Sequence, residues 1–147
     1  YGVNAAFAGL AYTFFAIAMT RGRFTGDYLI RDFGEKKLLT YSAICATLGL
    51  ALVSIAPYWW LVLVGYTLVG TGCSNIVPIM FSRAGRQTVM PSAVALSCVS
   101  TMAYTGILVG PAFIGMVSEL IGLSTVFMAL SGLLLLIVGL NRFTYVK

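Results

Sequence analysis

Long apolar blocks separated by short polar breaks make up the hydropathy pattern of the chain. The blocks have the length of about 20 mainly apolar residues that an α-helix needs to cross a bilayer. They are apolar on all sides, whereas the strands of a membrane barrel alternate between apolar and polar residues. The pattern therefore predicts an all-α membrane protein with five transmembrane helices, over residues 3–20, 38–56, 59–81, 91–117 and 124–140, and with a loop over residues 21–37.

The composition indicates a surface that faces lipid. Hydrophobic residues make up 60% of the 147 positions and charged residues only 9%, whereas a soluble domain carries about 25% charged residues. A lipid bilayer is therefore the first expected partner. The chain starts at Tyr1 without a Met or a signal-peptide pattern, so we expect a segment of a longer protein.

The basic residues fall on one side of the predicted five-helix topology. The opposite side holds the start of the chain and the breaks at Pro57 and Glu119. The positive-inside rule assigns the basic side to the cytoplasm. We therefore expect an integral protein of a bacterial inner membrane, with a cytoplasmic C-terminus and a periplasmic first residue. Short basic clusters between apolar blocks suit anionic lipid headgroups, and no nucleic acid partner is expected. The basic residues are Arg21, Arg23, Arg31, Lys36, Lys37, Arg83, Arg86, Arg142 and Lys147.

The residue pattern gives little indication of a metal site, a cofactor or an enzyme. The three cysteines lie inside apolar blocks and the chain contains no His, so we expect neither a metal site nor a cofactor. The sequence shows no nucleophile and base at catalytic spacing and no phosphate-binding loop. We therefore do not expect an enzyme.

Residues 21–37 form the first candidate functional region. The sequence Arg-x-x-Gly-Asp opens at Arg23, and Arg-x-Phe-Gly opens at Arg31, shortly before a pair of lysines. Glycines allow the chain to turn tightly, and suitable charges near helix ends gain about 0.3–1 kcal/mol each. Such a set can hold helix ends together in one conformation, although a charge run alone is more often a solvated loop that fixes topology. The predicted gating residues are Gly26, Asp27, Arg31, Asp32, Gly34 and Lys36.

This loop resembles the cytoplasmic loop signature of the major facilitator superfamily, which follows the second helix of each six-helix half. The resemblance implies that the chain is a C-terminal half fragment, from the eighth helix to the twelfth, and that it works with a missing N-terminal half. The chain departs from the family pattern at Arg31, where an Asp is usual, and the interval from Gly26 to Gly34 is longer by one residue. Asp27 and Asp32 are therefore out of register with the family's acid.

The fourth predicted helix carries a Gly-x-x-x-Gly-Pro run. Small residues let a neighbouring helix approach closely, and a proline removes a backbone donor and can bend the helix. The run is similar to the glycine-proline motif of the superfamily's fifth helix, here in that helix's counterpart. Ordinary packing of small residues is the alternative interpretation. The predicted packing residues are Gly106, Gly110, Pro111 and Gly115.

Polar residues inside the predicted helices are the candidates for contact with a solute. Two glycines, an amide and a proline interrupt the third helix between Gly70 and Pro78, and such interrupted helices mark the central site of many transporters. A hydrogen bond between helices, of about 0.6 kcal/mol, is the alternative role for Asn75. Spacings of three and four place the polar residues of the fourth helix on one face. The predicted substrate-binding residues are Asn75, Tyr104, Thr101, Ser97, Thr71 and Asn4.

The sequence predicts secondary active transport of a small polar solute, such as a sugar, by a permease. The predicted lining groups are neutral hydroxyls, amides and aromatics. None of the four acidic residues lies inside a predicted membrane block, so a residue that binds a coupling ion is expected outside this chain. The alternative is a small five-helix membrane scaffold without transport activity.

Overall fold

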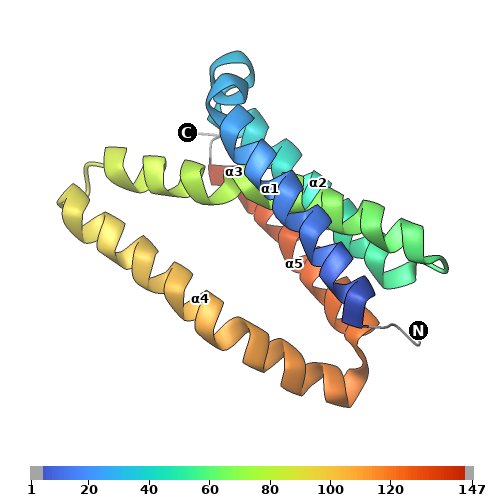
Figure 1. Cartoon of the computed structure of the whole chain (residues 1–147). Coiled ribbons are helices and arrows are strands. Elements are labelled where there is room, and N and C mark those ends of the chain that lie inside the picture. The colour runs from blue at the N-terminus through green and yellow to red at the C-terminus, as the bar shows by residue number, and fades with distance from the viewer. Residues whose placement is uncertain (1–4, 145–147) are drawn as a thin grey trace.

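The computed structural model describes residues 5–144, with side chains up to residue 141. These residues form five helices and no strand (Figure 1). The all-α fold and the number of helices predicted from the sequence are confirmed. The helices are α1 (Ala5–Phe33), α2 (Glu35–Ile55), α3 (Trp59–Arg86), α4 (Ser92–Ile121) and α5 (Leu123–Thr144).

Four of these helices, α2 to α5, are long and apolar enough to cross a bilayer. Helix α1 has 29 residues, but its described apolar part ends at Thr20 and is followed by Arg21. The crossing predicted over residues 3–20 starts before the described part of the chain. The membrane span of α1 therefore stays a prediction.

The predicted loop over residues 21–37 is wrong. Helix α1 continues to Phe33, and α2 starts two residues later at Glu35. Arg21 to Phe33 contains no proline to stop a helix, and its glycines, Gly22 and Gly26, are helical and buried. The turn depends on Gly34 alone, whose φ of 78° lies in the left-handed region that glycine adopts without a steric penalty.

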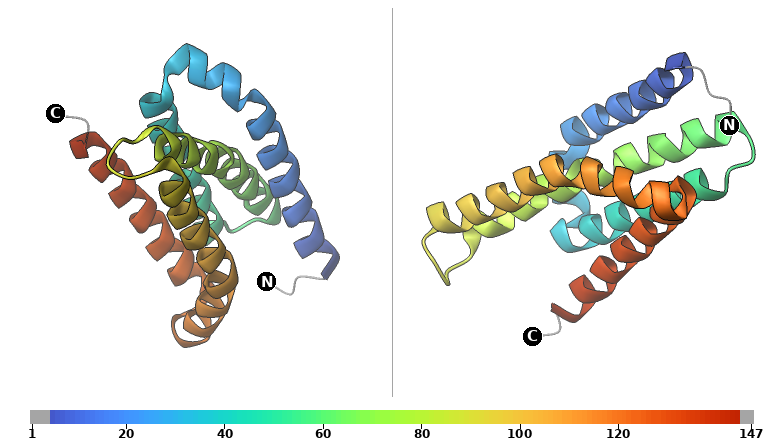
Figure 2. Two further views of the ribbon diagram at one scale, coloured as in Figure 1. Left: turned by 90° about the vertical axis from the view of Figure 1, so that its left-hand side faces the viewer. Right: turned by 90° about the horizontal axis from the view of Figure 1, so that it is seen from below.

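Helices α2 and α3 form the centre of the bundle. Helix α1 packs on α3, and α5 packs on α2, so α1 and α5 lie on opposite sides of the central pair (Figure 2). Glycines let the two central backbones approach closely. A Cβ atom added to Gly49 would lie 2.7 Å from the Gly65 carbonyl oxygen, and one added to Gly72 would lie 2.5 Å from the Ala46 backbone nitrogen.

The middle of helix α4 lies apart from the other helices. Figure 1 shows it meeting α3 near its start and α5 near its end, and Ala95 is its buried residue. The turns at the two ends of α4 are formed by residues that are close together in the sequence. Gln87 Oε1 accepts hydrogen bonds from the backbone of Val89 and Met90, and Gly122, with a φ of 84°, separates α4 from α5. One long face of α4 is therefore not covered by the described residues.

Candidate functional site

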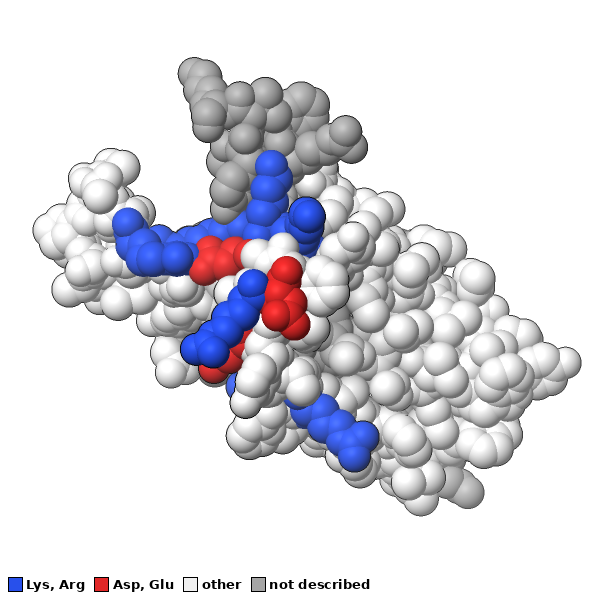
Figure 3. All heavy atoms as spheres, turned by 90° about the horizontal axis from the view of Figure 1, so that it is seen from above, with Lys and Arg blue, Asp and Glu red and all other residues white. Residues whose placement is uncertain are grey.

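Charged residues from α2 and α3 meet at one end of the bundle (Figure 3). Glu35, the first residue of α2, forms ion pairs with Arg83 and Arg86 near the end of α3, and Arg83 Nε lies 3.9 Å from Glu35 Oε2. The Arg83 and Glu35 side chains are 23% and 22% exposed. Partly buried charges are screened by salt less than exposed ones. Glu35 therefore holds the end of α3 against the start of α2.

Asn141 extends this contact to α5. Arg83 Nη1 donates a hydrogen bond to Asn141 Oδ1 at 3.4 Å, and Asn141 Nδ2 donates one to Thr40 Oγ1 at 3.3 Å. Asn141 is buried, and a buried amide is stable only when it is hydrogen-bonded. We call Glu35, Thr40, Arg83, Arg86 and Asn141 the polar clamp, because together they join the ends of three helices.

Sequence reasoning did not identify Glu35. The gating prediction rested on Asp27 and Asp32, whereas Arg83 and Arg86 pair with Glu35. A local signal existed, because an acid in the first turn of a helix is favoured by the helix dipole. No local signal linked Glu35 to arginines near the end of another helix. That contact depends on how α2 and α3 cross.

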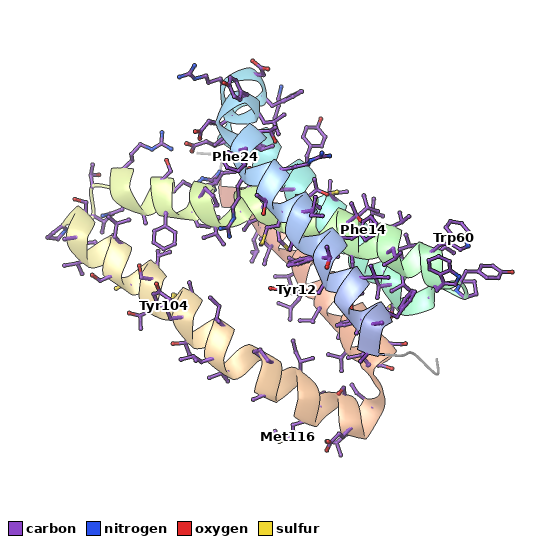
Figure 4. The ribbon with its side chains drawn as sticks, in the orientation of Figure 1. Tyr12, Phe14, Phe24, Trp60, Tyr104 and Met116 are labelled. Carbon is purple, nitrogen blue, oxygen red and sulfur yellow. The ribbon has the colours of Figure 1, made fainter. Side chains whose placement is uncertain are left out.

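The other predicted gating residues lie near the same end, on α1 and at its turn. Asp27 and Arg31 line an open hollow of about 330 Å³ with Phe24 and Tyr28, and Figure 4 shows Phe24 near this end of α1. Asp32 and Lys36 are exposed on either side of the Gly34 turn. Gly26 is different, because it faces α3. The structure thus brings Asp27 and Arg31 together, on the outer side of α1.

A seam of small and polar residues joins α1 to α3. A Cβ atom added to Gly22 would lie 2.2 Å from Ser74 Oγ, and one added to Gly26 would lie 2.3 Å from Asn75 Oδ1. Ser74 and Asn75 are 0% and 5% exposed. Asn75 therefore lies between two helices of the chain. This placement favours the alternative role, contact between helices, over direct contact with a solute.

The predicted polar stripe of α4 is exposed. Tyr104 is 68% exposed, and Figure 4 marks it on α4. Ser97 and Thr101 are exposed as well, and Thr71 is exposed on α3. Asn4 lies outside the described residues. These hydroxyls and this phenol are thus not covered by the described residues.

The predicted packing residues of α4 have open space beside them in the described part of the chain. A Cβ atom added to Gly106, Gly110 or Gly115 would meet nothing within 4 Å, and Pro111 lies inside the continuous helix. The glycines that bring helices together are instead those of the central pair and of the α1–α3 seam. A close helix neighbour for this face of α4 stays a prediction for a longer protein.

Metal binding has no visible site in the described part of the chain. There, no three His, Cys, Asp or Glu side chains lie close enough together to hold a metal ion.

Comparison with known proteins identifies a family. Residues 1–146 match the Major Facilitator Superfamily. The chain is 40% identical over 141 residues to an uncharacterized MFS-type transporter of Yersinia pestis, a match that covers 96% of this chain and 37% of that protein. It is 36% identical over 114 residues to the membrane protein MosC of Rhizobium meliloti, covering 78% of this chain and 28% of that protein.

A more distant relative is named for drug efflux. The chain is 28% identical over 139 residues to the multi-drug resistance efflux pump PmrA homolog of Lactococcus lactis, covering 93% of this chain and 34% of that protein. The chain thus spans about a third of the length of these relatives. No solved structure matches it.

Proposed function

This chain belongs to the major facilitator superfamily, and we propose on that premise that it forms the eighth to the twelfth helices of a secondary transporter. The complete protein would carry a small polar solute across a bacterial inner membrane by alternating access, with this segment rocking against the N-terminal half. The segment's own contribution would be one wall of the solute pathway and one cytoplasmic gate.

The observation that carries this proposal is the set of polar side chains on α4. Ala95 is the buried residue of this membrane-length helix, and Ser97, Thr101 and Tyr104 are exposed. Polar groups that face hydrocarbon are costly, so such a face is expected to meet protein or a water-filled cavity. We assign solute contact to these three residues, to Thr71 on α3 and to Asn4. Neutral groups of this kind favour an uncharged polar solute, such as a sugar.

Asn75 takes a supporting role in this proposal. Its amide lies in the α1–α3 seam, against Gly26, where it can set how closely α1 approaches α3. Thr71, one turn earlier on α3, is exposed. A change at Asn75 would then weaken the packing of α1 on α3 rather than remove a contact with the solute.

The charged end of the bundle would be the cytoplasmic gate. The positive-inside rule supports a cytoplasmic position for this end. Asp27, Arg31, Asp32 and Lys36 would form contacts that change with the conformation, beside the polar clamp. A coupling ion would bind in the rest of the protein, because the acids of this chain lie near helix ends rather than in the middle of a span.

The test is transport by the full-length protein in inverted membrane vesicles. The panel contains labelled sugars, polyols, amines and amphipathic drugs, the last because one relative is named a drug efflux pump. Collapsing the proton gradient or the sodium gradient identifies the coupling ion. Tyr104→Ala should lower transport about tenfold, which corresponds to about 1.4 kcal/mol. Met102→Ala is the control, because Met102 is an exposed apolar residue of the same helix and its loss should change little.

Two results would contradict the proposal. If the folded full-length protein moved no solute of the panel, the scaffold alternative would be favoured. If Tyr104→Ala transported as well as the unchanged protein, the solute pathway would not run along this face of α4.

A further inference from the structure

The hydroxyls of the α4 stripe share one hydrogen-bonding arrangement. Ser97 Oγ donates to the Ala93 carbonyl oxygen at 2.8 Å, and Thr101 Oγ1 donates to the Ser97 carbonyl oxygen at 2.8 Å. Thr105, one turn further, donates to the Thr101 carbonyl oxygen at 2.7 Å. Each hydroxyl proton is thus already bound to the backbone of α4 itself.

Thr71 on α3 has the same arrangement. Its Oγ1 donates to the Thr67 carbonyl oxygen at 2.5 Å. Ser and Thr hydroxyls inside helices commonly bond to the carbonyl four residues earlier. On a surface that lines a solute pathway, this bond limits which hydrogen bonds the hydroxyl can still make. A hydroxyl has one proton to donate and two lone pairs that accept. Once the proton is bound to the backbone, the group presents only lone pairs to its surroundings.

The stripe is therefore a row of hydrogen-bond acceptors. Positions four residues apart on a helix are separated by about 6 Å along its axis, so Ser97, Thr101 and Thr105 form an evenly spaced row. A solute that donates hydrogen bonds can use these lone pairs without breaking any bond. A solute that only accepts must first pull a proton away from a backbone carbonyl.

The positions of the basic residues support the same preference for solutes that donate hydrogen bonds. The described basic side chains lie on α1 from Arg21 onward, at the start of α2 or in the last turn of α3, and α4 itself carries none. A carboxylate or phosphate would thus find no cation on the helix that carries this row. Tyr104, which is 68% exposed on the same helix, offers a ring face that attracts cations.

We infer that this wall of the pathway selects solutes by their hydrogen-bond donors. These are the O–H groups of an uncharged polyol, as proposed above, or the N–H groups of a protonated amine, which would replace that uncharged solute. Anions and solutes that only accept hydrogen bonds would be disfavoured. The inference rests on the proposed transport function and names the chemical class of its solute.

The test compares solutes that differ only in their donors, using the purified full-length protein in detergent. The probe pairs are phenethylamine with its trimethylammonium analogue, and mannitol with its fully O-methylated ether. The member with donors should bind more tightly by about fivefold for each hydrogen bond made. Tighter binding within the first pair identifies amines as the donor class, and tighter binding within the second identifies polyols.

Variants locate the effect on α4. Thr101→Val removes the acceptor and keeps the shape, so it should weaken the donor member about fivefold and leave the methylated member unchanged. Thr101→Ser keeps the acceptor and should behave like the unchanged protein. Thr20→Val is the control, because Thr20 on α1 makes the same bond to its own helix, at 2.8 Å to the Ala16 carbonyl oxygen, outside the stripe.

The outcomes separate this inference from the proposed function. Equal binding within both pairs, tighter binding of the methylated members, or equal losses for both members in Thr101→Val would overturn the inference while transport itself stands. Failure of the full-length protein to bind or transport any solute of the panel would overturn both.

Discussion

Replacing Gly72 with alanine should separate the two central helices. A Cβ atom at this position would lie 2.5 Å from both the Ala46 backbone nitrogen and the Ser42 carbonyl oxygen. Neither is the flexible end of a side chain, so neither can rotate away. Ordinary contacts start at 3.4 Å, so α2 and α3 must move apart by about 0.9 Å, the difference between 3.4 and 2.5 Å.

The magnitude follows from the contacts that such a movement weakens. A gap of 0.5–1 Å forfeits about a quarter to a half of the 0.1–0.2 kcal/mol in each atom pair. For a seam with about 50 such pairs, the number that one buried leucine makes, the loss is about 1–5 kcal/mol. Measured costs of overpacking are about 1–3 kcal/mol, and we expect a loss in that range.

Gly132→Ala is the matched control. Gly132 lies inside α5, and a Cβ atom there would meet nothing within 4 Å. Alanine is favoured over glycine in a helix interior by about 1 kcal/mol, and this gain is common to both variants. The difference between the two variants therefore isolates the steric effect at Gly72.

The assay is unfolding of the purified protein in mixed micelles with increasing SDS, followed by far-UV circular dichroism. Gly72→Ala should be less stable than Gly132→Ala by about 1–3 kcal/mol, and Gly72→Val should be less stable still. Equal stability of Gly72→Ala and Gly132→Ala, within about 0.5 kcal/mol, would show that α2 and α3 do not cross at this glycine.

Three further substitutions test the turn, the polar clamp and the α1–α3 seam. Gly34→Ala should lower the thermal stability by about 1–2 kcal/mol, because a φ of 78° is strained for alanine; an unchanged melting temperature would contradict the turn. Glu35→Gln should cost about 1 kcal/mol at low salt and less at 1 M salt, whereas Glu119→Gln at the opposite end should cost little; equal effects of the two would refute the clamp. Asn75→Ala should lower the stability by about 1–2 kcal/mol, and with it the abundance of the protein in the membrane, because Asn75 is 5% exposed. The KM for the solute should change little. A raised KM at normal abundance would indicate instead that Asn75 contacts the solute.

Features that depend on a single segment of the chain could be predicted from the sequence. Apolar block length marked the helices α2 to α5, because a span must be long and apolar whatever it packs against. The break near Glu119 was predicted as well, and the turn there lies at Gly122, whose positive φ is a local property of glycine. The extent of α1 was not determined, because hydropathy marks the polar stretch after Thr20 but backbone hydrogen bonding continues through it to Phe33.

Which of several similar residues act together depends on the packing of the helices. Gly72 and Gly110 look alike in sequence, yet Gly72 lies against the Ala46 backbone, whereas a Cβ atom added to Gly110 would meet nothing within 4 Å. Asn75 carries an amide that could line a solute pathway, but it is buried in the α1–α3 seam. Glu35 holds the arginines of α3. These contacts depend on how each helix is rotated and where it crosses its neighbour, which are relations between segments far apart in the chain.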